Sequence, residues 1–98
     1  MKIDKIQNGK ELTLAIEGRL DTETSPELDK IVTESIGGIE TLILDFANLE
    51  YISSAGLRVL LKSHKAMIDK GQMKITNVSD IVLSIFDVTG FTDILTIE

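Results

Sequence analysis

The segment DFANLEYISSAGLRVLL, residues 45–61, predicts the end of a strand, a short loop and then a long amphipathic helix. The run Leu42–Leu44 directly before it is apolar throughout, which is typical of a buried central strand, and we expect Asp45 to close that strand. After the loop, leucines recur at helical spacing, and Gly71 predicts the end of the helix. A buried strand followed by an amphipathic helix indicates an α/β fold.

Two adjacent serines, Ser53 and Ser54, fall where this helix is expected to begin. The first backbone N–H groups of a helix have no partner within it, so a helix start stabilises a nearby anion. The fold would therefore tolerate a phosphate on a serine here, although the phosphate adds about −1.5 to −2 charges to the surface. Spacing alone also fits a plain capping role for Ser54, because serine is favoured at helix N-termini.

Upstream of this segment, the chain predicts a hairpin, a loop and a helix. The hairpin turns at Asn8-Gly9, and its second strand, Leu12–Ile16, alternates apolar with polar or small residues. We expect a loop from Gly18 to Thr24, and then a helix that starts at Ser25-Pro26 and closes at Gly37-Gly38.

Downstream, a short strand around Met73–Ile75 precedes a helix that Ser79-Asp80 can cap and Gly90 ends. Ile94–Ile97 predicts a terminal edge strand. This order of elements predicts an α/β sandwich in which three main helices pack on a mostly parallel sheet with an N-terminal antiparallel hairpin.

Composition narrows the classes of function. The 98 residues fit one domain, residues 1–98, and the net charge of −6 repels nucleic acid and anionic lipid, so we expect protein partners with basic patches. Without cysteine there is no disulfide, thiolate metal site or cysteine nucleophile. No apolar run resembles a signal core or a membrane span, and we expect a cytoplasmic protein without membrane insertion.

Two motifs resemble the signature of the STAS family, the anti-sigma factor antagonists of bacterial partner switching. Ser53-Ser54-Ala55-Gly56-Leu57 is similar to the family motif that opens a helix, and Gly18-Arg19-Leu20-Asp21 is similar to its Gly-x-Leu-Asp turn. The resemblance covers the whole chain in element order and implies the STAS sandwich. It also implies a module that binds an anti-sigma factor or GHKL-type serine kinase when unphosphorylated, is released by phosphorylation, and is reset by a PP2C-type phosphatase.

The resemblance further implies the site residues. Ser54 stands two positions before Gly56, where the family carries its phospho-acceptor. Ser53 replaces a frequent aspartate and becomes a competing acceptor, whereas Ala55 cannot be one. Asp21, Ser53, Ser54, Gly56 and Arg58 are then expected to meet the partner.

Each of these residues has a plainer interpretation. Asp21 can simply make its turn, and Gly56 can serve close packing. Arg58, one helical turn after Ser54, can reach a phosphate there or simply face solvent.

No catalytic constellation or cofactor motif is recognisable, so we expect neither an enzyme nor a bound cofactor or metal. His64 is interpreted as a packing residue, and Asp45 as a single carboxylate too weak to define a metal or base site. A second hypothesis is a non-phosphorylated STAS-like scaffold subunit, for instance beside a transporter, in which Ser54 is only a cap. The sequence leaves nucleotide binding and oligomeric state open.

Overall fold

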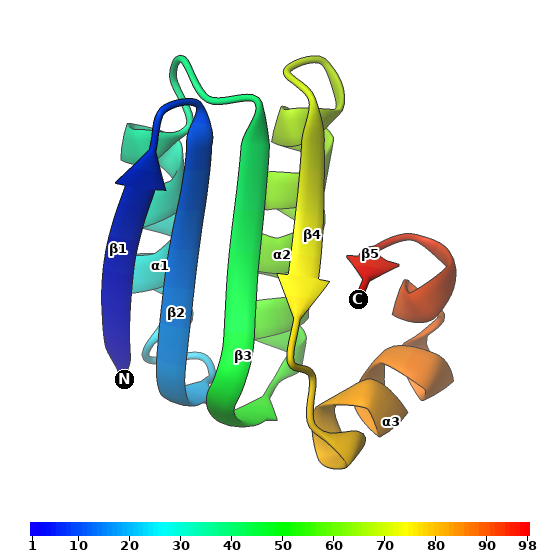
Figure 1. The fold of residues 1–98 in the computed structure, drawn as a ribbon. Coiled ribbons are helices and arrows are strands. Elements are labelled where there is room, and N and C mark those ends of the chain that lie inside the picture. Colours follow the sequence, from blue (N-terminus) through cyan, green and yellow to red (C-terminus); the bar gives the residue numbers. More distant parts are fainter.

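The computed structural model describes residues 1–98 and contains one five-stranded mixed sheet (Figure 1). The strands lie side by side in chain order; β1 pairs antiparallel with β2, and every later pair is parallel. This confirms the mostly parallel sheet with an antiparallel N-terminal hairpin. The strands are β1 (Lys2–Asn8), β2 (Glu11–Leu20), β3 (Thr41–Ile52), β4 (Gln72–Thr76) and β5 (Thr96–Ile97).

Two helices, α1 (Ser25–Ser35) and α2 (Ser54–Ile68), lie next to each other behind the sheet, and α3 (Asp80–Thr89) lies beyond β4 (Figure 1). A single 3₁₀ turn, η1 (Phe91–Asp93), connects α3 to the last strand. None of these helices is long and apolar enough to cross a membrane.

The core lies between the sheet and the helices. Apolar side chains alternate along β2 and β3, so that Leu14 and Leu44 are fully buried on the helix face. Phe46 of β3 meets Phe86 of α3 with their ring centroids 6.5 Å apart, which anchors α3 to the sheet. Aliphatic packing dominates the core, since most of the buried residues are leucine and isoleucine.

Two of the expected boundaries on the strands that lead to the candidate site are wrong. The expected loop at Gly18–Thr24 begins late, because β2 continues through Leu20, and β3 does not end at Asp45 but continues to Ile52. The pairing between β2 and β3 shifts register between Ala15 and Glu17 and again after Gly18. Such irregularities let strands absorb extra residues and continue past polar positions that otherwise indicate a strand end.

The C-terminal part follows the sequence more closely. Ser79 Oγ accepts a hydrogen bond from the backbone N–H of Val82 at 3.3 Å, and Gly90 ends α3 in the left-handed region at φ +80°. The last strand is shorter than Ile94–Ile97, because η1 and the residues after it form a turn and only Thr96–Ile97 pair with β4.

Candidate functional site

The candidate site lies where β2 and β3 end together. Leu20 and Ile52 are paired in the parallel register, so the chain leaves both strands at the same edge of the sheet. The backbone N–H of Ser53 donates to the carbonyl oxygen of Leu20 at 2.9 Å. This pairing places the Asp21 turn, which follows Leu20, next to the start of α2.

The two serines at the start of α2 have different environments. Ser53 is the N-cap residue, but its side chain makes no capping hydrogen bond, and its Oγ is buried without any partner. Ser54 is the first residue of the helix and is exposed. The N-cap interpretation of Ser54 is therefore wrong, because Ser53 occupies that position.

Backbone donors are available beside Ser54. The first N–H of α2 that reaches a carbonyl of the same helix is that of Leu57, which donates to Ser53 O at 2.9 Å. The N–H groups of Ser54, Ala55 and Gly56 precede it and have no partner within the helix. Together with the helix dipole, they make this helix end favourable for a negative charge on Ser54.

Gly56 holds the start of α2 close to the end of β2. A Cβ at this position would lie 2.7 Å from Cγ1 of Ile52 and 2.9 Å from both Cγ and the carbonyl oxygen of Leu20. No ordinary side chain fits at such distances without a shift of the backbone. The absence of a Cβ therefore has a packing role here, and it brings Ser54 to the Asp21 turn.

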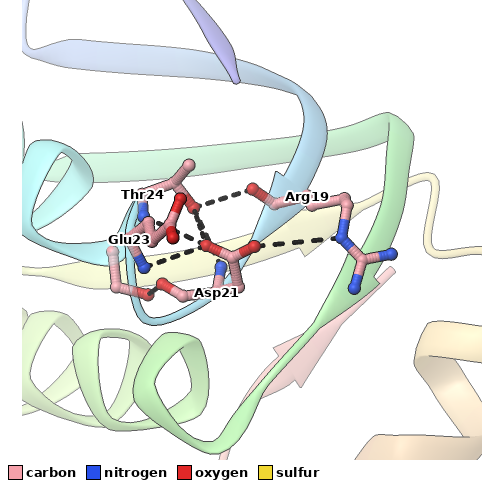
Figure 2. A network of polar contacts seen from close by, with 5 residues as sticks. Arg19, Asp21, Glu23 and Thr24 are labelled. Carbon is pink, nitrogen blue, oxygen red and sulfur yellow. Dashed lines mark hydrogen bonds and ion pairs between the residues drawn. The ribbon is translucent and has the colours of Figure 1, made fainter.

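Asp21 forms a closed turn before α1 (Figure 2). Its Oδ1 accepts hydrogen bonds from the backbone N–H groups of Glu23 and Thr24 at 3.0 and 3.1 Å, and its own N–H donates to Thr24 Oγ1 at 2.9 Å. This reciprocal pairing of residues three apart has the pattern of a capping box. The turn-forming role of Asp21 is confirmed.

The same contacts set the electrostatics of Asp21. The backbone N–H of Thr24 is the main cause that lowers the pKa of this carboxyl from 3.8; partial desolvation opposes it, and nearby Arg19 adds least. The ionised Asp21 carboxylate therefore stabilises the fold at any pH above its ordinary pKa. This stabilisation is lost as the pH falls through the lower pKa of the folded state. At neutral pH Asp21 is a carboxylate.

One oxygen of that carboxylate has no hydrogen bond, and the side chain as a whole is 31% exposed. Oδ2 of Asp21 accepts no hydrogen bond and has only Arg19 Nε near it, at 3.8 Å (Figure 2). The Arg19 guanidinium also lies 4.4 Å from the ring centroid of Tyr51, its neighbour across the β2–β3 pairing. No hydrogen bond joins the Asp21 side chain to either serine, so the two segments approach through Leu20 rather than through their functional groups.

Arg58 is exposed and makes no ion pair within the chain. It borders a hollow between the first turns of the two helices, which is lined from α1 by Ser25, Pro26 and Asp29 and from α2 by Ala55, Arg58 and Val59. The structure thus brings all the expected site residues to one end of the molecule, around the starts of α1 and α2.

The two residues considered as minor candidates lie elsewhere. Oδ1 of Asp45 accepts from the Ala47 N–H and from Asn77 Nδ2, both at 3.0 Å, so this carboxylate connects β3 to the loop after β4. No group of three or more histidine, cysteine or acidic residues is arranged to hold a metal ion. His64 is half-buried in the later part of α2, beside Met67 and Gly71.

Two features of the site were not predicted from the sequence. The partnership of Asp21 with Thr24 could have been found, since the two residues have the spacing of a capping box. The stacking of Arg19 on Tyr51 could not, because it depends on the register shift between β2 and β3.

Comparison with known proteins places this geometry in a family. The family model described as STAS domain matches residues 2–98. The chain belongs to the STAS family. The anti-sigma-B factor antagonist of Bacillus subtilis is 31% identical over an alignment that covers 100% of this chain and 91% of the relative.

Solved structures of the STAS family share the fold at low sequence identity. An anti-sigma factor antagonist from Mycobacterium paratuberculosis matches with a TM-score of 0.89 at 14% identity, over 98% of this chain and 83% of the other. The Bacillus cell fate determinant SpoIIAA in its phosphorylated form matches with a TM-score of 0.77 at 17% identity, over 99% and 91%. These matches agree with the two-layer arrangement described above.

Proposed function

We propose that this STAS protein is an anti-sigma factor antagonist controlled by phosphorylation of Ser54. The observation that carries the proposal is the contrast between the two serines: Ser54 is exposed at a helix start with unpartnered N–H groups, while Ser53 Oγ is buried. The naming of its relatives as anti-sigma-B factor antagonists supports the same function.

In the unphosphorylated state, the edge formed by the Asp21 turn and the start of α2 binds an anti-sigma factor that is also a GHKL-type serine kinase. The Ser54 hydroxyl attacks the γ-phosphorus of ATP, its proton passes to a base of the kinase, and ADP leaves. Once phosphorylated, the protein is released, because removing a dianion from water at the interface costs several kcal/mol, which a single nearby cation does not repay. Hydrolysis of the phosphoserine by a PP2C-type phosphatase restores the serine.

The chain acts in this cycle as a binding module and kinase substrate rather than as an enzyme. We place this cycle of binding, phosphorylation and release in the cytoplasm, where ATP-dependent kinases operate. Oδ2 of Asp21 is the oxygen that a basic group of the partner can reach, since Oδ1 is occupied by its own turn. Arg58, Gly56 and Ser53 border the same contact edge.

The test is a binding cycle with the GHKL-type kinase from the same organism. Calorimetry measures the affinity of the unphosphorylated chain, of the chain after treatment with ATP, and of the chain after treatment with the phosphatase. We expect tight binding, loss of binding and recovery, in that order. Equal affinity in all three states would exclude the switch and favour a scaffold subunit.

Asp21→Asn should weaken partner binding at least tenfold at neutral pH while the melting temperature stays near that of the wild type. Asparagine keeps an oxygen that accepts from Glu23 and Thr24, so the turn persists. The lost charge matters at the interface, where removing one partner of a desolvated charge pair costs about 2–5 kcal/mol. Asp69→Asn, at the far end of α2, is the matched control. Unchanged affinity in Asp21→Asn would leave Asp21 with only its turn-forming role.

A further inference from the structure

Between Ser54 and Ile68 the exposed face of α2 carries only positive charge, and the first acid after it is the C-cap residue Asp69. The helix sequence SAGLRVLLKSHKAMI contains Arg58, Lys62 and Lys65 and no acidic residue, although the whole chain has a net charge of −6. These three residues are exposed and spaced four and three apart, so they follow one face of the helix. We call them the basic stripe. Ser54, four residues before Arg58, lies at its N-terminal end.

Helix stability does not account for this stripe. A cation in the last turn interacts favourably with the helix dipole, which explains Lys65, but Arg58 lies near the N-terminal end of the helix, where a cation gains nothing from the dipole. Within the chain, only Lys62 is neutralised: its Nζ lies 3.0 Å from Oδ1 of Asp29 on α1. Arg58 and Lys65 make no ion pair and are available to a partner.

We propose that the basic stripe is a docking surface for acidic side chains of the protein partner, and that phosphorylation of Ser54 switches it off by charge neutralisation. The inference rests on the proposed function and adds the chemistry of the partner surface. A phosphate on Ser54 lies one helical turn from Arg58, within reach of a bidentate guanidinium contact. Its charge of about −1.5 to −2 cancels most of the stripe.

The charges around the stripe favour an acidic protein over a membrane or a nucleic acid. The neighbouring helix α1 places Asp29 beside it, and the other acids of this chain, whose net charge is −6, add to the repulsion of an extended polyanion. A protein surface can instead place a few carboxylates opposite the stripe and avoid those acids. The hollow between α1 and α2, which borders Arg58, lets such a surface approach closely.

The first test needs no kinase. Phosphoserine is incorporated at position 54 during translation, and ³¹P NMR follows the second ionisation of the phosphate against pH. Contact with Arg58 lowers the pKa of the phosphate, so Arg58→Gln should raise that pKa relative to the parent phosphoprotein, while Lys70→Gln should not. Equal titration of all three phosphoproteins would overturn the coupling of the phosphate to the stripe, whatever the outcome with a kinase.

The second test uses a short polyglutamate peptide and the ¹⁵N-labelled chain at about 20 mM salt, where surface charges are little screened. We expect chemical-shift changes at residues 54–66 that vanish in the Ser54 phosphoprotein. Shifts elsewhere, or shifts that persist after phosphorylation, would overturn the proposal. Retention of the unphosphorylated chain on anionic phosphatidylglycerol vesicles would assign the stripe to membranes instead and would also overturn it.

The third test measures binding to the GHKL-type kinase. Arg58→Glu/Lys65→Glu should lower the affinity at least tenfold, since each exposed pair contributes about two- to fivefold and reversal adds repulsion. Arg58→Gln/Lys65→Gln should lose less affinity than the charge-reversed variant, and its affinity should depend less on salt than that of the wild type. Lys30→Glu/Lys70→Glu has the same change in net charge on exposed residues off the stripe and should bind as the wild type does. If both charge-reversed variants lost affinity equally, net charge alone would explain the effect and the basic stripe would not be a specific docking surface. The phosphorylation switch proposed above would not be affected by that result.

Discussion

Ser54→Asp should bind the anti-sigma partner about a hundredfold more weakly or worse, and yet unfold at nearly the same temperature as the wild type. The loss of affinity follows from removing the added charge from water in the interface, which costs several kcal/mol. The fold does not suffer, because an acid at the first helical position gains about 0.3–1 kcal/mol from the helix dipole. Isothermal calorimetry and thermal unfolding on one preparation measure both quantities.

The matched control is Asn8→Asp, which adds the same charge at the last residue of β1, beside the turn to β2 and at the opposite end of the sheet (Figure 1). The new carboxylate lies across from the exposed Glu11, which costs at most about 1 kcal/mol, so this variant should keep its affinity and nearly all of its stability. If Ser54→Asp instead unfolded far below the wild type, charge at position 54 would act through local unfolding, and the binding mechanism would be wrong.

Gly56→Ala should destabilise the fold by about 1–3 kcal/mol, the range typical of overpacking in a close contact. The new Cβ would meet Ile52 Cγ1 at 2.7 Å and the backbone oxygen of Leu20 at 2.9 Å, and that oxygen already accepts a hydrogen bond from Ser53. The gain in helix propensity of about 1 kcal/mol only partly offsets this clash. Chemical denaturation measures the change.

Gly37→Ala provides the comparison for this prediction. A Cβ at Gly37 meets nothing within 4 Å, and its backbone is not in the left-handed region. The substitution should leave stability unchanged or raise it by about 0.4–1 kcal/mol, through the reduced freedom of the unfolded chain. A Gly56→Ala protein as stable as Gly37→Ala would show that the start of α2 is not held tightly against β2.

Most of the fold could be predicted because local signals and tertiary structure agree. Ser25-Pro26 and Gly90 act through backbone preferences that do not depend on distant contacts. The expected hairpin forms, but its turn lies at Gly9-Lys10 instead of Asn8-Gly9, because Asn8 pairs with Glu11 as the last residue of β1. The strand ends were less predictable. Polar residues such as Asp45 and Asn48 indicate a stop, but pairing with β2 across shifted register keeps β3 continuous to Ile52.

The candidate site was also predictable only in part. Its location could be predicted, because each of the two sequence motifs lies at the end of one of two neighbouring strands. Which serine is accessible could not be predicted, since the burial of Ser53 Oγ depends on how α2 packs against Leu20. The positive charge of α2 can be read from the sequence. The exposure of these side chains and the ion pair between Lys62 and Asp29 are seen only in the structure.

Mass spectrometry of the peptide that contains Ser53 and Ser54, after incubation with the GHKL-type kinase and ATP, decides which serine is the phospho-acceptor. We predict one phosphate, located on Ser54, with normal incorporation in Ser53→Ala and none in Ser54→Ala. Ser54→Ala removes no capping residue, because Ser53 is the N-cap residue of α2. The variant should therefore remain folded. Phosphate on Ser53, or full incorporation into Ser54→Ala, would contradict the account.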